Sequence, residues 1–334
     1  MHERRMGADG TMVSAIGVGA MSFTDFYGPT EDSASMALLD AAFEAGVTHL
    51  DTSNVYGAGR SERVIGAFLK ARGAVTRDRL HIATKAGITR DPDTGARRFD
   101  NSPGHLTAEL EGSLKRLGVE AVDLFYVHRR EAARPIEEVT ETLAGLVKAG
   151  KTRAIGFSEI APASLRRAAA IHPIAAVQSE YSLWTRAPEL GLVQTCAALG
   201  TTLVAFSPVG RSMLTDHPIP KERFAECDLI PQNPRFQEPN WSANMKIADG
   251  FRAFAAEMGV PAAGLAIAWL LAQGDHVVPI PGTRSLTHFA ELVTGTRVAL
   301  NPEDLAKIER ILPVGWAHGD RYSDAQWFGP ERYC

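Results

Sequence analysis

Four residues that could act together in acid catalysis follow three apolar segments of the chain. Asp51, Lys85 and His128 each close such a segment, and Tyr56 comes shortly after Asp51. A phenol is a poor acid at neutral pH because its ordinary pKa is about 10. A nearby lysine cation favours tyrosinate and lowers that pKa, and a carboxylate would keep the lysine charged and oriented. With a histidine to hydrogen-bond a carbonyl oxygen, the set predicts that Tyr56 protonates an alkoxide.

Such an acid would serve the reduction of a carbonyl group to an alcohol. No side chain supplies a hydride, so a nicotinamide cofactor must carry it. Taken singly, Asp51 would more often be a capping residue and Lys85 a solvated charge. His128 alone would be a structural histidine, and Tyr56 alone a packing residue. All four at the ends of neighbouring strands are much harder to explain as packing.

The elements that must position these residues alternate between short apolar runs and longer amphipathic stretches. The sequence predicts strands over residues 13–18, 47–51, 80–85, 122–128, 152–157, 175–180, 202–206 and 277–280. It predicts helices over residues 31–45, 61–72, 103–117, 136–149, 162–170 and 188–199. Thr30 is the expected cap of the first helix. Nearly continuous apolar strands are typical of a parallel sheet that is covered on both faces.

Eight such units indicate a (β/α)₈ TIM barrel with long active-site loops. A doubly wound open sheet is the alternative, but no glycine-rich fingerprint follows the first strand. We expect one barrel domain over residues 1–334, with a long loop at 207–240 and a C-terminal tail at 313–334. Because parallel strands of a barrel carry chemistry at their carboxyl ends, the four residues should meet at one mouth. The aromatic residues of the two segments predict docked binding loops: Phe236, Trp241, Trp316, Tyr322 and Trp327.

Composition excludes several other classes of function. The formal net charge of −4 gives no basic stripe for nucleic acid, and no apolar run is long enough to span a membrane. The pairs Arg97-Arg98 and Arg129-Arg130 are expected to be surface or loop residues. The three cysteines, Cys196, Cys227 and Cys334, are odd in number and widely spaced, which predicts no disulfide framework and no metal site. With a polar N-terminus, these features predict a cytoplasmic protein.

At these residues the sequence resembles the aldo-keto reductase superfamily, in its bacterial NADPH-dependent form. The resemblance covers nearly the whole chain and rests on several motifs taken together. They are Val-Ser-Ala-Ile-Gly-Val-Gly (13–19), Asp-Thr-Ser-Asn-Val-Tyr-Gly (51–57), Ala-Thr-Lys (83–85), Asp-Leu-Phe-Tyr-Val-His-Arg (123–129), Ile-Gly-Phe-Ser (155–158), Val-Gln-Ser-Glu-Tyr-Ser (177–182) and Ile-Pro-Gly-Thr-Arg-Ser (280–285).

The resemblance implies a (β/α)₈ barrel that reduces aldehydes or ketones with NADPH. It implies that Tyr56 is the acid, that Lys85 and Asp51 tune it, and that His128 orients the carbonyl. Ser158 and Gln178 would hold the nicotinamide carboxamide. Phe206 would stack on the nicotinamide ring, the segment from Ser207 to Gly210 would follow the pyrophosphate, and Arg284 with Ser285 would meet the 2′-phosphate. The implied cofactor contacts are Gly19, Met21, Asp51, Ser158, Glu159, Gln178, Phe206, Ser207, Pro208, Val209, Gly210, Arg211, Gly282, Thr283, Arg284, Ser285, His288 and Glu291.

Three positions depart from the family pattern. Glu159 replaces a common Asn, His288 replaces a common Arg, and Leu292 replaces a common Asn, although Glu291 matches. A carboxylate at residue 159 can accept from the carboxamide but cannot donate to it. Arg284 can recognise a phosphate bidentately. The departures weaken the preference for NADPH, so NADH is an alternative cofactor.

The substrate is expected to be a small carbonyl compound of apolar or aromatic character. Its contacts are predicted to be Phe23, Phe26, Tyr56, His128 and Trp184, beside Met21, Tyr27, the 207–240 loop and the tail. Two other functions stay open: a nicotinamide-binding regulatory subunit with little turnover, and an aldolase in which Lys85 forms a Schiff base. The oligomeric state, monomer or homo-oligomer, is also open.

Overall fold

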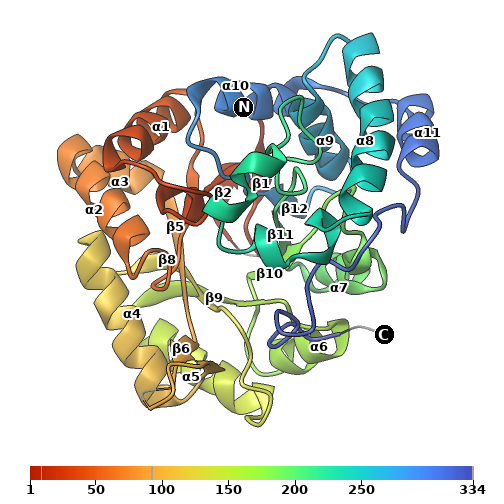
Figure 1. Ribbon diagram of the computed structural model, residues 1–334. Helices are drawn as coiled ribbons and strands as arrows, with labels where there is room; N and C mark the ends of the chain where they lie inside the picture. The colour runs from red at the N-terminus through yellow and green to blue at the C-terminus, as the bar shows by residue number, and fades with distance from the viewer. Residues whose placement is uncertain (9, 92, 333–334) are drawn as a thin grey trace.

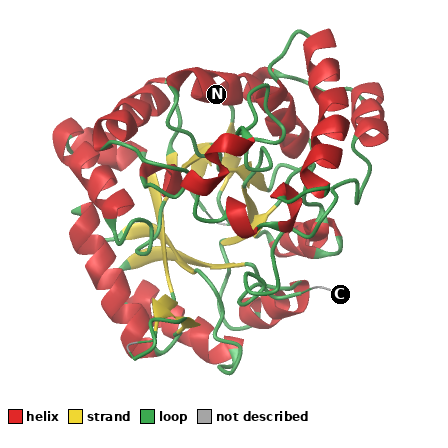
Figure 2. Ribbon diagram, viewed as in Figure 1, coloured by secondary structure: helices red, strands yellow, loops and turns green. Residues whose placement is uncertain are grey.

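The centre of the computed structural model is a parallel sheet rolled into a barrel, with helices around it (Figures 1 and 2). The structure describes residues 1–8, 10–91 and 93–332, and in these residues the sheet has eight strands. In spatial order they are β3 (Gly17–Gly19), β4 (His49–Asp51), β5 (His81–Ala86), β8 (Val122–Val127), β9 (Thr152–Ser158), β10 (Ala176–Glu180), β11 (Thr202–Phe206) and β12 (Val277–Pro279). The predicted (β/α)₈ barrel is confirmed.

The two end strands of the sheet meet through glycine. The backbone N–H of Gly19, at the end of β3, donates to the carbonyl of Pro281, just after β12, at 2.9 Å. A Cβ atom at Gly19 would lie 2.6 Å from the carbonyl oxygen of Ile280, and one at Gly282 would lie 2.7 Å from that of Gly19. Only glycine therefore lets the chain approach closely enough to close the barrel at its mouth.

The helices that surround the strands begin and end at residues that terminate helices for known reasons. Ser102 caps α4 by accepting from the His105 N–H, and Gly118 ends this helix in the left-handed conformation. The predicted cap Thr30 is wrong: Glu31 is the N-cap residue, and its side chain makes no capping bond. The main helices are α1 (Asp32–Glu44), α2 (Arg60–Arg72), α3 (Ala74–Arg79), α4 (Pro103–Leu117), α5 (Ile136–Lys148), α6 (Pro162–Ala169), α7 (Leu192–Leu199), α8 (Asn240–Glu257), α9 (Ala262–Leu271), α10 (Leu286–Thr294) and α11 (Pro302–Ile311).

The predicted first strand over residues 13–18 is wrong in its extent. Its first half lies in β2 (Met12–Ser14), which pairs antiparallel with β1 (Glu3–Arg5), and only β3 belongs to the barrel. The buried side chain of Arg4 donates to the carbonyls of Gly274, Val277 and Leu271, close to the amino end of β12. This hairpin therefore covers the end of the barrel opposite the mouth.

A second hairpin, which the sequence did not predict, follows β5. It consists of β6 (Ile88–Arg90) and β7 (Arg97–Phe99), and it lies outside the barrel sheet. The predicted helix over 188–199 is shorter than expected. Gly191, at φ 119°, separates the 3₁₀ turn η2 (Ala187–Glu189) from α7.

The loop at 207–240 and the tail at 313–332 pack on each other above the barrel. The loop contains η3 (Lys221–Glu226), η4 (Ile230–Gln232) and η5 (Pro234–Phe236). Trp184 contacts Phe236, with ring centroids 5.5 Å apart, and stacks on Trp316 of the tail at 6.1 Å. These aromatic residues are buried, so the two segments are held by packing as well as by polar contacts.

Within the described residues, Cys196 and Cys227 are free and buried, and Cys334 lies outside these residues. The described residues contain no cluster of three or more His, Cys, Asp or Glu side chains that could hold a metal ion. No described helix is by itself long and apolar enough to cross a membrane, although α8 and α9, bent by 89°, pass that test together.

Candidate active site

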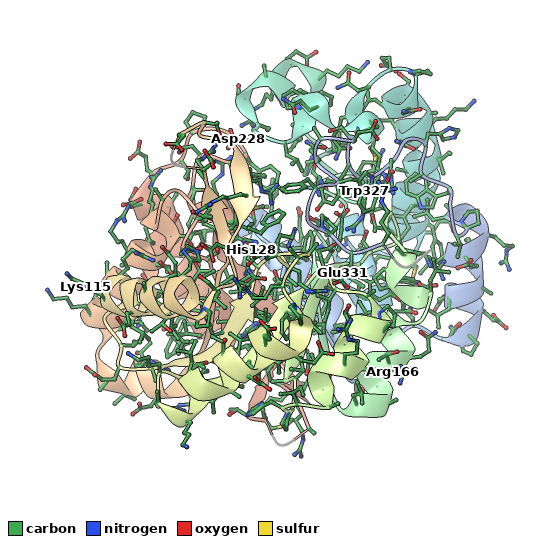
Figure 3. The ribbon with its side chains drawn as sticks, turned by 90° about the horizontal axis from the view of Figure 1, so that it is seen from below. Lys115, His128, Arg166, Asp228, Trp327 and Glu331 are labelled. Carbon is green, nitrogen blue, oxygen red and sulfur yellow. The ribbon has the colours of Figure 1, made fainter. Side chains whose placement is uncertain are left out.

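A cavity of about 1450 Å³ opens at the carboxyl ends of the barrel strands. His128 lies beside it in the interior of the molecule (Figure 3). The sheet register brings the predicted catalytic residues together here, because Asp51 pairs with Ala83 on β5 and Lys85 pairs with Tyr126 on β8. Asp51, Tyr56 and His128 lie on the cavity wall, and Lys85 lies directly behind Asp51.

Lys85 and Asp51 form an ion pair inside the barrel. Lys85 is fully buried and Asp51 is 2% exposed. The Lys85 ammonium donates to the Asp51 carboxylate and, at 2.8 Å, to the carbonyl of Thr52. The second carboxylate oxygen of Asp51 accepts from the Gln178 amide at 2.7 Å. Burial lowers the pKa of Lys85, and the Asp51 charge opposes that change.

Tyr56 lies between this pair and His128. The Lys85 Nζ is 5.3 Å from the centre of the Tyr56 ring, and the Tyr56 and His128 rings are nearly perpendicular, with centroids 5.7 Å apart. The predicted lowering of the Tyr56 pKa is wrong for this structure. Burial raises the pKa, and the Asp51 carboxylate raises it further. Because burial and the Asp51 charge both favour the neutral phenol, Tyr56 stays protonated at neutral pH and can donate.

His128 is a neutral imidazole in this environment. Burial lowers its pKa well below the ordinary value, and the charges of Arg129, Lys85 and Arg97 act in the same direction. Its Nδ1 atom lies 3.1 Å from the hydroxyl of Ser53. A neutral imidazole carries one N–H, so His128 can donate one hydrogen bond without bringing a second cation into the site.

Most of the predicted cofactor positions lie on the wall of the cavity. Ser158 and Gln178 face each other in the β9–β10 register, which places them together beneath the mouth. Ser285 caps α10 by accepting from the His288 N–H. The predicted positions on the wall are Gly19, Met21, Asp51, Ser158, Gln178, Phe206, Ser207, Pro208, Val209, Arg211, Gly282, Thr283, Arg284, Ser285, His288 and Glu291.

These residues fit a phosphorylated dinucleotide. The start of α10 presents backbone N–H groups, and a helix N-terminus with a nearby guanidinium suits a phosphate. Arg284 lies on the wall, but its guanidinium donates to the carbonyls of Tyr27, Gly28 and Pro29 at 2.6–2.8 Å. A phosphate bound here would accept hydrogen bonds from Arg284, either in addition to these three carbonyls or in place of them.

Four predicted contact residues do not lie on the wall. Phe23 is fully buried in the core, and Trp184, 4% exposed, packs against Phe236 and Trp316. Gly210 lies behind the wall, where a Cβ atom would come 2.6 Å from the Trp184 ring. Glu159 is 1% exposed and turns away toward the C-terminal tail. The expected roles of Phe23 and Trp184 in substrate contact, and of Glu159 and Gly210 in cofactor contact, therefore need correction.

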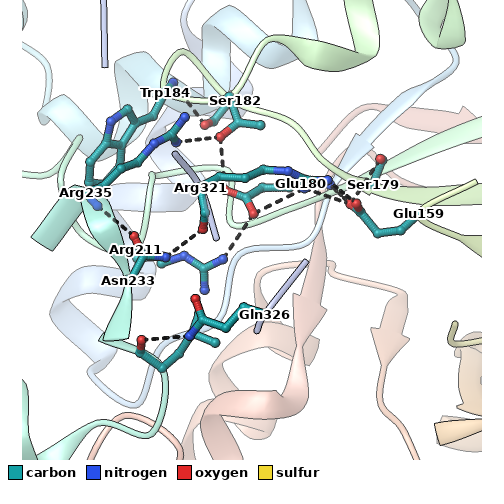
Figure 4. A network of polar contacts seen from close by, with 12 residues as sticks. Glu159, Ser179, Glu180, Ser182, Trp184, Arg211, Asn233, Arg235, Arg321 and Gln326 are labelled. Carbon is teal, nitrogen blue, oxygen red and sulfur yellow. Dashed lines mark hydrogen bonds and ion pairs between the residues drawn. The ribbon is translucent and has the colours of Figure 1, made fainter. Parts of the chain in front are cut away.

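Glu159 belongs to a buried network of two carboxylates and two guanidinium groups (Figure 4). The Arg321 guanidinium pairs with Glu159 and lies 3.5 Å from Glu180. Arg211 donates to Glu180 at 3.1 Å. Each of these side chains is at most 9% exposed. The network joins the ends of β9 and β10 to the 207–240 loop and to the tail, and we call it the rim network.

Arg129 is a wall residue that sequence reasoning missed. Of the expectation that it is a surface or loop residue, the loop is confirmed, because Arg129 follows the end of β8, but the surface is wrong, because Arg129 is 8% exposed and lines the cavity. Its guanidinium donates to the His128 carbonyl at 2.6 Å and to the Ser158 hydroxyl at 2.9 Å. The signal was its place directly after His128 at a strand end. Other wall residues that were not predicted include Asn54, Val55, Arg90, Arg97, Glu109 and Gln326.

Comparison with known proteins identifies the relatives of this chain. The sequence profile of the "Aldo/keto reductase family" matches residues 15–313. The Schizosaccharomyces pombe protein "Aldo-keto reductase yakc [NADP(+)]" is 37% identical over 96% of this chain and 94% of its own length. The Glycine max protein "Probable aldo-keto reductase 1" is 38% identical over 95% of this chain and 91% of its own length.

Solved structures agree with the sequence relatives. The glycerol dehydrogenase AKR11B4 from Gluconobacter oxydans superposes with a TM-score of 0.81 at 27% identity, over 93% of this chain and 94% of its own. Proteins of this kind are carbonyl-reducing oxidoreductases that use nicotinamide cofactors. With the family profile covering most of its length and the barrel in place, the chain belongs to the aldo/keto reductase family.

Proposed function

We propose that this protein reduces an aldehyde or ketone to the alcohol with a hydride from NADPH, and that Tyr56 is the general acid. The observation that supports the proposal best is the convergence of Tyr56 and His128 on one wall, backed by the Asp51–Lys85 pair. Ser158 and Gln178 lie on the same wall, where they would hold the carboxamide of a nicotinamide. The cofactor, when bound, supplies the hydride.

The chain's own residues then handle the carbonyl oxygen and its proton. The neutral His128 donates a hydrogen bond to the carbonyl oxygen and so orients it. The phenol of Tyr56, protonated at neutral pH, transfers its proton to the oxygen as negative charge develops there. The Lys85 ammonium, 5.3 Å from the centre of the Tyr56 ring, stabilises the resulting tyrosinate. The hydrogen bond from Gln178 to Asp51 keeps the Asp51–Lys85 ion pair oriented toward the reacting atoms.

NADPH is the proposed cofactor because Arg284 and the start of α10 offer a site for the 2′-phosphate. The fission yeast relative is named for NADP(+), which agrees with this choice. His288, exposed on the first turn of α10, stands on the same part of the wall and adds a donor.

The geometry disfavours a Schiff-base aldolase. A lysine must expose its amine to a carbonyl carbon before it can form a Schiff base. Lys85 is fully buried, and its ammonium already donates to Asp51 and to the carbonyl of Thr52. A substrate would have to break this buried pair to reach the amine.

The test of the proposal is turnover of NADPH with a reactive aldehyde such as 4-nitrobenzaldehyde. Tyr56→Phe should lower kcat by about 100-fold or more, because general-acid groups contribute at least that much. NADPH binding, followed by its fluorescence, should persist, since the phenol is not a cofactor anchor. Tyr181→Phe is the matched control, because the Tyr181 phenol bonds to Glu189 away from the cavity.

Full activity in Tyr56→Phe would overturn the assignment of the acid. Tight NADPH binding by a wild-type protein that turns over no aldehyde would favour the regulatory-subunit alternative. Covalent labelling of Lys85 by borohydride and substrate, in the absence of nicotinamide, would favour the aldolase.

A further inference from the structure

Three guanidinium groups line the cavity near the catalytic histidine: Arg90, Arg97 and Arg129. Arg90 and Arg97 come from the two strands of the β6–β7 hairpin, and Arg129 directly follows His128 at the end of β8. Among the described residues, none of the three forms an ion pair with a carboxylate. This part of the wall, which we call the bare arginine cluster, is positively charged.

Arg129 is the most unusual member of this cluster, because it is buried with little compensation. Its guanidinium donates to one carbonyl and one hydroxyl, and its buried Nε atom has no hydrogen-bond partner in the described residues. Burying a cation without a counter-ion is costly unless a partner charge arrives. The unmade bond and the lack of a directly paired carboxylate in the described residues both point to a ligand.

The acidic residues of this region form hydrogen bonds or ion pairs with residues outside the cluster. Glu109, which also lines the cavity, accepts from the Asn54 amide at 2.6 Å. Asp100 lies 3.9 Å from Arg98, and Glu331 pairs with Arg130. No carboxylate of the described residues pairs directly with the bare arginine cluster, whose three cations line the cavity.

We propose that the bare arginine cluster binds an anionic group of the substrate, so that the natural substrate is a carbonyl compound with a carboxylate or a phosphate. This inference rests on the proposed carbonyl reduction and names its substrate class. A guanidinium recognises either anion through paired N–H donors. Because Arg129 is the neighbour of His128, the anion would bind beside the carbonyl that His128 and Tyr56 orient.

The inference changes the expected character of the substrate. Aromatic and apolar wall residues such as Phe26, Val55 and Tyr322 still suit an organic body. The positive charge of the bare arginine cluster, beside His128, suits an acidic group at one end of that body. A neutral aromatic carbonyl would leave the Arg129 charge buried and unmatched.

The test compares two aldehydes that differ in charge and share a ring. Wild-type kcat/KM should be about tenfold higher or more for 4-carboxybenzaldehyde than for methyl 4-formylbenzoate, since hydrogen bonds to charged groups are stronger than neutral ones. Arg97→Met should remove most of this preference while the rate for the ester changes little. Arg129→Met should also remove the preference, and it is judged by the ratio of kcat/KM for the two aldehydes, because Arg129 also donates to Ser158 at the proposed cofactor site. Arg98→Met, on the same hairpin but outside the cavity wall, is the matched control and should behave as wild type.

A second comparison of substrates identifies the anion. The values of kcat/KM for 4-formylphenyl phosphate and 4-carboxybenzaldehyde are compared, and the higher value shows whether the site favours phosphate or carboxylate. Preference for either over its neutral analogue, lost in the variants, supports the cluster. Equal kcat/KM for the charged and neutral aldehydes in wild type would overturn it. So would an Arg129→Met variant that loses affinity for NADPH and loses activity equally on both aldehydes, since Arg129 would then serve the cofactor through Ser158.

Binding measured without turnover separates this inference from the proposed function. In calorimetric titrations, wild-type protein should bind 4-carboxybenzaldehyde more tightly than Arg97→Met does. This difference is expected whether or not the protein oxidises NADPH. Absence of turnover together with this difference would refute carbonyl reduction and keep the anion site. Turnover of both aldehydes with no charge preference would support carbonyl reduction and refute the anion site. Arg97 is exposed on its hairpin, so Arg97→Met tests the anion site without removing a buried side chain.

Discussion

The rim network and the bare arginine cluster border the same cavity, but the arginines of the first pair with carboxylates and those of the second pair with none in the described residues. In the rim network two guanidinium groups, of Arg211 and Arg321, meet two carboxylates, of Glu159 and Glu180. In the bare arginine cluster the guanidinium of Arg129 has only a carbonyl and a hydroxyl. Balanced buried charge holds segments of the chain together, whereas unbalanced charge at a cavity wall is suited to a ligand.

The rim network also explains a departure from the family pattern. Glu159 stands where the family commonly has an Asn, and a contact with the cofactor was expected there. Its carboxylate instead accepts from Arg321 and from the backbone N–H of Glu180. The negative charge at this position anchors the tail, and Ser158 and Gln178 are left to face the cavity.

Breaking the rim network should have the largest effect on stability. Arg321→Met would leave Glu159 buried without its main partner, and we expect the free energy of unfolding to fall by about 3–5 kcal/mol. Urea denaturation followed by tryptophan fluorescence measures this change.

Arg129→Met provides the contrast, because it removes a buried guanidinium that has no carboxylate. We expect the free energy of unfolding to change by no more than about 1 kcal/mol. A loss as large as that of Arg321→Met would show that Arg129 is structural and that the comparison between the two groups fails.

Acid should weaken the rim network over a defined range of pH. Burial alone would raise the pKa of Glu159, but the charge and hydrogen bonds of Arg321 outweigh it and lower the pKa to about 2. A folded-state pKa below the ordinary value of 4.5 stabilises the protein above about pH 4.5. This contribution, about 3 kcal/mol, is lost as the pH falls from about 5 toward 2.

The measurement is urea denaturation of wild type and Glu159→Gln at pH 7 and at pH 3. Wild type should lose more stability than the variant between these two values, because the variant has no carboxylate to protonate at residue 159. Equal losses in both proteins would mean that the Glu159 carboxylate does not contribute to folding in this way.

Arg284 is the intermediate case, since its guanidinium is held by three backbone carbonyls and by no carboxylate. Arg284→Ala should weaken NADPH binding by about tenfold and leave NADH binding nearly unchanged, because only NADPH has the 2′-phosphate. Fluorescence titration with each cofactor measures both affinities. An equal loss for the two cofactors would assign Arg284 to the loop at Tyr27 to Pro29 alone.

Local patterns were sufficient to predict much of the barrel. Pro103 and Gly118 mark the observed ends of α4, and the apolar runs before Asp51, Lys85 and His128 are strands. Helix ends and strand runs depend on neighbouring residues, so the sequence carries them directly. The strand at 13–18 failed because nothing in its apolar pattern marks the break after Ser14.

The roles of several charged and aromatic side chains depend on segments far away in the sequence. Glu159 and Arg321 are 162 residues apart, and no local pattern links them. Trp184 was expected at the substrate, but Phe236 and Trp316 enclose it in the core. Such outcomes follow from how loops pack on the mouth, which the periodicity of strands and helices does not describe.

The sequence by itself determined the barrel and the residue types at its strand ends, because the apolar pattern that defines each strand and helix depends on neighbouring residues. It therefore predicted that Asp51, Lys85 and His128 meet, with Tyr56 just beyond. Only the tertiary structure decided which charges are neutralised, since ion pairs form between side chains that the fold brings together. That is why Arg129, expected at the surface or in a loop, lies buried in the loop beside His128 and forms no ion pair with a carboxylate of the described residues.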